Sequence, residues 1–391
     1  MHIALYSPEL PSSGSANGIV TYTRIMQAAL KAAGHRATVF DRFGIEHDDG
    51  SIEQLGPDSR IAARIGRLRE RIVGRSPVRW PVRFRHIIER IHSRHPIDVI
   101  EMEESFGFAG RLGLGIPVVT RLHGPHIFGK DEREPPQIAR VSAARMEIER
   151  QALVGASGIT SPSARLLDDT LGYYGISPTR TAFIQNPMPL SGTPWSVEGA
   201  RTNNLLFIGR FDLRKGADIT LRAFALAAKK VDDLSITMCG PDRGITTDDN
   251  ENIKCKEWIN KNIDKKIAGR IKFLGDIDHN TLNELRKIHK LQLSTSRFET
   301  FSYSIAESLA VGMPVVMANT YGLAEVVTDR ENGFVAPIGD VNAFADAVVA
   351  ALSDCERLAR IGAAGRGLCA RLLSPERIAA QTVDFYRTIS G

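Results

Sequence analysis

The chain has 391 residues, of which 43% are hydrophobic and 24% are charged, and its formal net charge is +5. This length favours two domains, and the composition is typical of a globular protein rather than a disordered or fibrous one. No apolar run approaches the roughly 18 residues of a membrane-spanning helix, and the N-terminus leads directly into a predicted strand. We therefore expect neither a membrane span nor a signal peptide. The four cysteines lack C-x-x-C and metal-ligand spacings, which indicates reduced thiols in a cytoplasmic protein.

Short apolar runs alternate with helical patterns through the first half of the chain. We predict strands at Ile3–Tyr6, Thr38–Asp41, Asp98–Glu101, Pro117–Thr120, Gly158–Ser161 and Ala182–Ile184. Apolar runs without alternation are typical of strands that are buried on both faces of a parallel sheet. A helix from about Val20 to Ala33 ends at Gly34, a residue that favours helix C-termini. Residues 1–190 are therefore predicted to form a doubly wound α/β domain.

A second series of the same kind follows a stretch rich in Gly, Pro and Ser. That stretch runs from Asn186 to Gly199 and is predicted to be a linker. The strands predicted beyond it are Leu205–Ile208, Ser235–Cys239, Ile271–Leu274, Leu291–Thr295, Pro314–Ala318 and Gly333–Val335. Residues 200–374 are therefore predicted to form a second Rossmann-like domain. Two such domains bind ligands in a cleft at the carboxyl ends of their strands.

The segment from Ser296 to Val316 is the most informative part of the sequence. A loop of small polar residues leads from a buried strand into a helix, which starts near Phe301 or Ser302 and stops at Gly312. A helix N-terminus of this kind favours an anion such as a diphosphate. Glu299 and Glu307 would repel phosphates, so we expect them to accept hydrogen bonds from hydroxyl groups. A diphosphate flanked by two polyols is a nucleotide sugar.

This segment resembles the signature of the family 4 glycosyltransferases, which have the GT-B fold. The similarity lies in Glu299-x7-Glu307 and the Gly-x-Pro-Val-Val that follows it. The resemblance implies that Glu307 holds the ribose hydroxyls of the donor and that Glu299 contacts the transferred sugar. It also implies that the last helix, within residues 375–391, packs back on the first domain.

The stretch Gly209 to Gly216 directly follows a predicted strand and contains two candidate diphosphate ligands, Arg210 and Lys215. Arginine offers a planar fork of donors and lysine a mobile point charge, a combination suited to a diphosphate. The pattern G-R-x5-K-G resembles the phosphate-binding loop of the family, in which the position of Arg214 is free, so we expect Arg214 to be solvated. The G-K-[ST] ending of a Walker A loop is absent.

Two positions in the first domain resemble donor contacts of the family. Gly18 follows a small-residue turn after the first strand, where relatives present a backbone N–H to the donor diphosphate, although a plain strand-to-helix turn has the same composition. His123 lies just past a strand end in Thr-Arg-Leu-His-Gly and resembles the histidine that reaches the donor sugar. His126 is a poorer candidate for that role.

Strand-end turns at Gly240 and at Gly275-Asp276 resemble the segments that meet the nucleotide base. The chain departs from the family pattern nearby. Tyr321 and Ser302 stand where glycine is usual, and Arg330 with Glu331 replaces the usual Gly-x. These departures leave the fold assignment intact but put the identity of the donor in doubt.

We expect no metal and no other cofactor. The carboxylate pairs Asp48-Asp49 and Asp248-Asp249 lie in polar loops, and the family neutralises the donor charge with arginine, lysine and helix N-termini.

The basic character of the chain is concentrated between Arg60 and His95, where 11 Arg and 2 Glu give a local balance of 11 − 2 = +9. Residues 60–75 combine an apolar stripe at helical spacing with flanking arginines, a pattern of helices at membrane surfaces and also of solvated helices packed on a core. We therefore leave open a peripheral location on an anionic membrane. Nucleic acid is not expected, because no aromatic residues are interleaved with the arginines.

Taken together, the sequence predicts a retaining, metal-independent glycosyltransferase that moves a sugar from a UDP- or GDP-sugar to an acceptor hydroxyl. The catalytic candidates are Glu299, His123, Arg210 and Lys215, and the acceptor is expected to be a glycan or a lipid-linked precursor. Two alternatives stay open from the residues alone: a nucleotide-sugar 2-epimerase of the same architecture and a non-catalytic nucleotide-sugar-binding protein.

Overall fold

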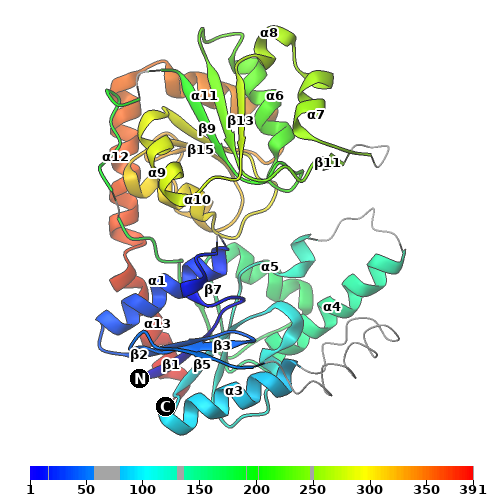
Figure 1. Ribbon diagram of the computed structural model, residues 1–391, viewed down its shortest axis with the longest axis vertical. Coiled ribbons are helices and arrows are strands. Elements are labelled where there is room, and N and C mark those ends of the chain that lie inside the picture. Colours follow the sequence, from blue (N-terminus) through cyan, green and yellow to red (C-terminus); the bar gives the residue numbers. More distant parts are fainter. Residues whose placement is uncertain are drawn as a thin grey trace. The chain divides into compact units, whose positions relative to one another are not determined.

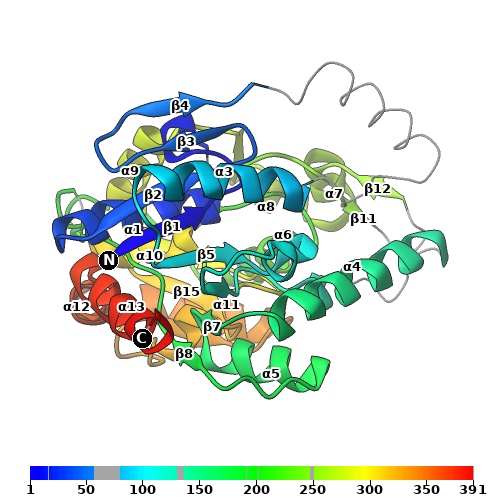
Figure 2. The same cartoon turned by 90° about the horizontal axis from the view of Figure 1, so that it is seen from below.

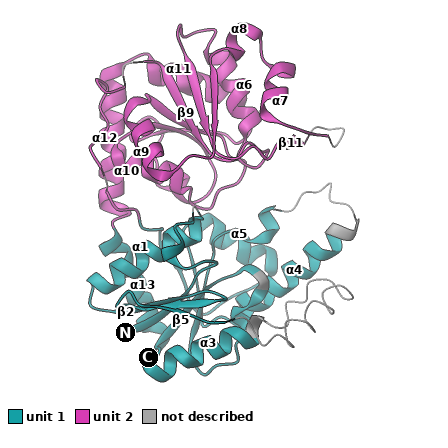
Figure 3. Ribbon diagram, viewed as in Figure 1, with its two compact units in different colours: residues 1–187, 375–391 teal, residues 188–374 magenta. Residues whose placement is uncertain are grey.

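The chain divides into two units, each built around a mainly parallel sheet (Figures 1 and 3). Unit 1 comprises residues 1–187 and 375–391, and unit 2 comprises residues 188–374. The computed structural model describes residues 1–15, 17–56, 80–129, 136–190, 192–200, 202–246 and 251–390. Unit 2 begins at Met188, ahead of residue 200 where the sequence predicted its start.

Among the described residues, eight strands form the sheet of unit 1 in the order β4-β3-β2-β1-β5-β6-β7-β8. Their bounds are β1 (His2–Tyr6), β2 (Arg36–Phe40), β3 (Gly44–Glu46), β4 (Ile52–Gln54), β5 (Val99–Glu103), β6 (Val118–Arg121), β7 (Gly158–Ser161) and β8 (Thr181–Phe183). The six strands β2, β1, β5, β6, β7 and β8 pair in parallel, as predicted. At the other end of the sheet, β3 and β4 add an antiparallel edge. The sequence did not predict this hairpin, because strands of three residues are too short to show a hydrophobic pattern.

Helices cover both faces of this sheet. They are α1 (Gly18–Ala32), α3 (Trp80–Arg94), α4 (Pro136–Val154), α5 (Ala164–Tyr174) and α13 (Pro375–Ser390). Ile100 and Met102 of β5 belong to a core that includes Phe84 and Ile88 of α3. Side chains alternate along a strand, so Glu101 points to the opposite face, where Tyr22 of α1 donates a hydrogen bond to it.

The last helix, α13, packs beside α1 in unit 1 (Figure 2). Its Ile378, Val383 and Tyr386 are buried, and the Tyr386 hydroxyl donates a hydrogen bond to Glu101. The chain must approach β7 closely here, because a Cβ atom at Gly158 would lie 2.5 Å from the side chain of Ile389. The resemblance to the family implied this return of the C-terminal helix.

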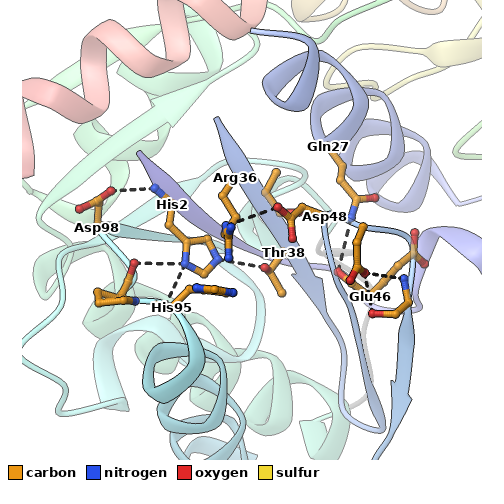
Figure 4. A network of polar contacts seen from close by, with 12 residues as sticks. His2, Gln27, Arg36, Thr38, Glu46, Asp48, His95 and Asp98 are labelled. Atoms are coloured by element: carbon orange, nitrogen blue, oxygen red, sulfur yellow. Dashed lines mark hydrogen bonds and ion pairs between the residues drawn. The ribbon is translucent and has the colours of Figure 1, made fainter. Parts of the chain in front are cut away.

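His2 ties the amino ends of the unit 1 strands together (Figure 4). One ring nitrogen lies 3.0 Å and 3.1 Å from the carbonyl oxygens of His95 and Pro96, and the other lies 2.9 Å from the hydroxyl of Thr38. The backbone N–H of His2 donates to Asp98 at 2.7 Å. Because ligands of doubly wound sheets bind at the carboxyl ends of the strands, we assign this network to stability.

Unit 2 contains a sheet whose described strands are all parallel, in the order β13-β10-β9-β14-β15-β16. Their bounds are β9 (Asn204–Ile208), β10 (Ser235–Cys239), β13 (Ile271–Gly275), β14 (Leu291–Ser294), β15 (Val315–Ala318) and β16 (Phe334–Ala336). Each strand overlaps a strand that the sequence predicted. A small antiparallel pair, β11 (Ile245–Thr246) with β12 (Asn252–Ile253), was not predicted.

Two separate cores lie on the faces of the unit 2 sheet. The helices are α6 (Ala217–Ala227), α7 (Cys255–Asn262), α8 (Lys265–Ala268), α9 (His279–Ile288), α10 (Tyr303–Val311), α11 (Val341–Leu352) and α12 (Cys355–Leu372). Val316 of β15 packs in the core that contains α6 and α11, whereas its neighbours Val315 and Met317 pack with α10 and the end of α12. Helices thus cover both faces of the parallel sheet, so unit 2 is a doubly wound domain, as predicted.

The stretch predicted to be a linker, up to Gly199, spans the boundary between the two units and is anchored to unit 2 by Trp195. Trp195 is 8% exposed, and its indole N–H donates to the carbonyl oxygen of His289 at 2.8 Å. The backbone N–H of Trp195 donates to Val311 at 2.7 Å. The Gly, Pro and Ser content of the predicted linker thus concealed one large anchoring side chain.

Candidate functional site

The residues that the sequence singled out in unit 2 gather at one edge of its sheet. They are Arg210 and Lys215 after β9, Gly240 after β10, Gly275 and Asp276 at the end of β13, and Glu299, Phe301, Ser302 and Glu307 after β14. The carboxyl ends of parallel strands meet at the same edge, and β10, β9 and β14 are neighbours in the sheet. This edge is where doubly wound domains bind ligands.

Asp212 organises the loop after β9. One of its carboxylate oxygens accepts the backbone N–H of Lys215 at 2.7 Å, and the other accepts the Nε–H of Arg210 at 2.6 Å. The loop ends at Gly216, which caps α6 with a φ of 68°. A Cβ atom there would lie 2.0 Å from the carbonyl oxygen of Thr295, so only glycine lets the loop rest against the end of β14. Arg210 remains 43% exposed at the mouth of the loop.

Lys215 and Glu299 form an ion pair between the loops that follow β9 and β14. The lysine ammonium donates to Glu299 Oε1, which also accepts the hydroxyl of Ser296 at 3.0 Å. The side chains of Lys215 and Glu299 are 25% and 15% exposed, respectively. A cation and a carboxylate are thus held side by side, partly shielded from water.

Arg214 is exposed, as expected, but its guanidinium also has an aromatic neighbour. The guanidinium carbon lies 4.9 Å from the centre of the Phe298 ring, and partial desolvation lowers the pKa of Arg214 against the opposing effect of Glu299. Phe298 in turn packs edge-on against Tyr321, with the ring centres 5.8 Å apart. The aromatic ring retains the arginine through a cation–π contact, which the sequence pattern did not indicate.

The N-terminus of α10 faces the same edge of the sheet. Ser302 caps the helix in the left-handed conformation, with φ 66° and ψ 79°, and no side-chain capping bond is made. A non-glycine residue in this region is strained by roughly 1–2 kcal/mol, and strain of this kind gathers at functional sites. Phe301 is 2% exposed, so it can offer a ligand only its backbone. The first N–H groups of a helix have no acceptor within it and favour an anion.

Glu307 has a partner that the sequence analysis missed. Arg286 of α9, whose side chain is 0% exposed, donates from Nη2 to Glu307 Oε2, while Glu307 itself is 19% exposed. His279, at the start of α9, lies 3.8 Å from the other oxygen, Oε1. The available signal was an arginine four residues after Leu282, on the apolar face of the segment that forms α9.

The turns after β10 and β13 meet the loop after β9 through their backbones. Gly240 has a φ of 130°, and a Cβ atom there would lie 2.2 Å from the carbonyl oxygen of Gly209. Its N–H donates to the carbonyl oxygen of Gly275 at 2.7 Å. Asp276 is exposed next to this contact. The backbones of these three turns are therefore in direct contact.

His123 and Gly18 lie at the corresponding edge of the unit 1 sheet. His123 follows β6, and its ring packs edge-on against Tyr22 of α1 with the ring centres 5.1 Å apart. Gly18 begins α1 one helical turn before Tyr22, and the side chain of Asn17 caps the helix by accepting the N–H of Ile19 at 2.8 Å. Burial lowers the pKa of His123 to about 3, and the charge of Arg121 acts in the same direction. The imidazole is therefore neutral at physiological pH.

A group of buried carboxylates behind His123 was also missed. The two oxygens of Glu104 accept the backbone N–H groups of His123 and Gly124 at 2.9 Å and 2.7 Å. Burial and the neighbouring charges of Glu149 and Glu103 raise the pKa of Glu104 to about 8. Burial raises the pKa of Glu103 to about 7. The sequence signal was a pair of glutamates directly at the end of a buried strand.

Other sequence predictions fall outside this site. His126 does not join His123; its backbone N–H donates to Glu149 at 3.0 Å. Asp48 pairs with Arg36 at 3.4 Å, whereas residues 60–75 and Asp248-Asp249 lie wholly outside the described residues. In the described part of the chain, no three His, Cys, Asp or Glu side chains are grouped as a metal would require.

The four cysteines form no disulfide. Of the helices that the structure describes, none has both the length and the apolar composition needed to cross a bilayer.

Known proteins share both halves of this architecture. A sequence profile described as "Glycosyl transferases group 1" matches residues 197–368, and one described as "Glycosyltransferase Family 4" matches residues 16–191. Glycogen synthase from Mycobacterium tuberculosis is 22% identical over 99% of this chain and 94% of its own length. These matches span both units.

Solved structures agree on the fold. Sucrose-phosphate synthase from Thermosynechococcus elongatus superposes with a TM-score of 0.74 at 20% identity, over 99% of this chain and 98% of that one. HepE from Anabaena, in complex with UDP-glucose, gives a TM-score of 0.66 at 17% identity, over 99% and 100% of the two chains. With two doubly wound units, each matched by its own profile, this chain belongs to the group 1 and family 4 glycosyltransferases of GT-B fold.

Proposed function

We propose that this glycosyltransferase retains the configuration of the transferred sugar and takes it from a nucleoside diphosphate donor at the edge of the unit 2 sheet. The observation that supports this most directly is the Lys215–Glu299 ion pair beside Arg210 and the N-terminus of α10. A diphosphate and a sugar hydroxyl need these groups next to each other. Cations and a helix N-terminus stabilise the departing diphosphate, while a carboxylate accepts hydroxyl hydrogen bonds.

The other contacts are those that the resemblance to the family implies. Glu307 holds the ribose hydroxyls, and the backbone turns at Gly240 and Gly275 with Asp276 hold the base. Phe301 and Ser302 offer backbone N–H groups to the diphosphate. Because Phe301 is buried, substitutions that keep its apolar volume should leave donor binding in place.

His123 and Gly18, at the edge of the unit 1 sheet, stay predicted donor contacts. A neutral imidazole both donates and accepts one hydrogen bond, which suits a sugar hydroxyl better than an imidazolium, which only donates. Gly18 offers a backbone N–H at the start of α1. Closure of the two domains over the donor, which would exclude water and limit hydrolysis, stays a prediction.

Relatives guide the proposed substrate class. The HepE complex contains UDP-glucose, which favours a UDP-hexose for this chain. The name of a relative, glycogen synthase, favours a sugar hydroxyl as the acceptor. Tyr321 and Ser302 replace the glycines usual in the family, so a hexose other than glucose is compatible with the site. No metal is needed in this mechanism, because Arg210, Lys215 and α10 neutralise the leaving diphosphate.

A ligand screen followed by product analysis tests this function. Thermal shift with UDP-, GDP- and ADP-sugars identifies the donor, since a ligand at 100 times its Kd stabilises the fold by roughly 2.7 kcal/mol. Proton NMR then follows the anomeric signal of the first product from an α-linked donor. We expect an α-linked product; a β-linked first product would overturn the retaining mechanism, and release of an epimerised sugar without acceptor would identify an epimerase instead.

The variant Glu299→Gln tests whether Glu299 orients the transferred sugar or acts as a general base. The amide keeps the shape and one acceptor oxygen, so turnover should fall while the affinity for the free nucleoside diphosphate is largely spared. Wild-type turnover in this variant would exclude Glu299 from contact with the transferred sugar.

A further inference from the structure

The carboxylate of Glu307 is held by a guanidinium that has no access to solvent. The Arg286 side chain is 0% exposed, and it donates from Nη2 to Glu307 Oε2. The other two nitrogens also donate: Nε–H donates to the hydroxyl of Ser308 at 3.1 Å, and Nη1 donates to Asn283 at 2.9 Å. The hydroxyl of Ser308 donates in turn to Gln292 of β14. The guanidinium is therefore braced by α9, α10 and the sheet, and its plane is fixed.

This arrangement gives the two oxygens of Glu307 different surroundings. Oε2 is taken by Arg286 on the buried side, whereas Oε1 lies 3.8 Å from Nδ1 of His279, a side chain that is 61% exposed. Glu307 therefore presents one oxygen, in one orientation, toward the exposed start of α9. A carboxylate that must accept hydrogen bonds from two adjacent ribose hydroxyls gains from such preorganisation, because no rotamer entropy remains to be lost on binding.

The buried charge of Arg286 needs a partner of opposite charge, so the contact with Glu307 is required for the stability of this site. Moving a guanidinium out of water is expensive unless a partner of opposite charge and further acceptors are in place. Burial lowers the pKa of Arg286, and Glu307 acts against that effect. Among the described residues, Glu307 is the carboxylate that pairs with Arg286.

We propose that Arg286 is the positioning residue of the ribose subsite, which fixes Glu307 Oε2 so that Oε1 meets the ribose hydroxyls of the donor. The proposal rests on the function proposed above for Glu307. Arg286 itself does not touch the donor and acts only through Glu307. Asn283 and Ser308 complete the support from the helices on either side.

The test compares ribose with 2′-deoxyribose in variants of Arg286. Calorimetry gives Kd for UDP and 2′-deoxy-UDP, and for GDP and 2′-deoxy-GDP, with the full-length protein. In the wild type the deoxy compound should bind roughly tenfold to hundredfold more weakly, the range for a hydrogen bond to a charged group. Arg286→Met should reduce this ratio to about threefold or less, and Arg286→Lys, which keeps charge but not the planar fork, should give an intermediate ratio.

Two further variants separate positioning from folding. The double variant Arg286→Met/Glu307→Gln removes both charges and so leaves no unpaired buried ion; its ratio should equal that of Glu307→Gln alone, because Arg286 acts only through Glu307. Arg297→Met is the matched control, since Arg297 also forms an arginine–carboxylate pair in unit 2, with Asp218 at 2.7 Å, but at 38% exposure. This control should keep the wild-type ratio.

The outcomes are distinct. An unchanged ratio in Arg286→Met, even with weaker binding of both nucleotides, would reduce Arg286 to a purely structural role and overturn the proposal. If the wild type binds the ribose and deoxyribose nucleotides equally well, the proposal for Arg286 is also overturned. The proposed function is not overturned by that result, because UDP or GDP still binds. If neither nucleotide binds the wild type, both the ribose subsite and the proposed donor site fail.

Discussion

Lys215 offers the sharpest test of the donor site, because the structure shows what its removal leaves behind. Lys215→Met removes the ammonium but keeps most of the side-chain length. The ammonium is bonded to Glu299, a carboxylate that is only 15% exposed. The variant therefore loses a charge-assisted bond to the diphosphate, and it also leaves an uncompensated negative charge beside the diphosphate.

The two losses can be estimated separately. A charge-assisted hydrogen bond contributes about 1.5–3 kcal/mol, which corresponds to roughly tenfold to hundredfold in Kd. Two like charges about 8 Å apart, at an effective dielectric constant of about 40, repel by about 1 kcal/mol. Lys215→Met should therefore weaken nucleoside diphosphate binding by roughly 50-fold to 500-fold. The double variant Lys215→Met/Glu299→Gln should recover about fivefold of this loss, because the repulsion disappears.

Calorimetric titration with UDP and GDP measures these effects, with thermal unfolding as the check on folding. Arg214→Ala is the matched control: it removes a cation from the same loop, but one that lies over the Phe298 ring. Arg210→Ala should fall between the control and Lys215→Met, since Arg210 is 43% exposed and already bonded to Asp212. Unchanged affinity in Lys215→Met would refute the diphosphate role, and a double variant no tighter than the single one would refute the repulsion.

Three further predictions concern metal, pH and the basic segment. Protein treated with EDTA should transfer sugar at its original rate, and activity restored only by added Mg²⁺ or Mn²⁺ would contradict the metal-independent mechanism. The pKa of Glu103 is raised to about 7 from 4.5 by burial, so the folded state binds this proton more tightly than the unfolded chain. The associated stability is full below about pH 4.5 and is lost as the pH rises to about 7, by at most about 3 kcal/mol. Urea unfolding from pH 5 to 8 should show this decline in the wild type and a smaller one in Glu103→Gln; parallel profiles would exclude the assignment. If residues 60–75 meet a membrane, co-sedimentation with anionic vesicles should weaken with salt and collapse when Arg64, Arg67 and Arg71 become Glu, whereas absence of binding at low salt would leave the solvated-helix interpretation.

The sequence predicted the strands and the loops at their ends well, for a local reason. Glycines mark the places where backbones must approach or turn, as at Gly216, where a Cβ atom would lie 2.0 Å from a carbonyl oxygen. Gly312 similarly caps α10 with a φ of 84°. Such constraints act within a few residues and are visible in a single chain. The anchoring of Trp195 was not expected, because the Gly, Pro and Ser residues around it are typical of exposed connections.

Partners of charged side chains were not predictable in this way. Lys215 and Glu299 are 84 residues apart and meet because β9 and β14 are neighbours in the sheet. Glu104 meets the backbone of His123 because β5 lies beside β6. Neither strand order can be read from residue types, so the sequence identified the groups that face the donor but not the groups that hold them.

This division between contacting and supporting groups changes how substitutions at the site should be interpreted. The sequence alone makes Glu307→Ala the natural test of ribose binding. The structure shows that the variant also leaves the 0% exposed guanidinium of Arg286 without its counter-charge. Breaking a buried pair in this way costs about 3–5 kcal/mol of stability, enough to lower activity through unfolding alone. Glu307→Gln also removes this counter-charge, although it keeps an acceptor oxygen for Arg286. The double variant Arg286→Met/Glu307→Gln leaves no unpaired buried ion, so its affinity for the ribose and deoxyribose nucleotides measures the loss of the carboxylate contact itself.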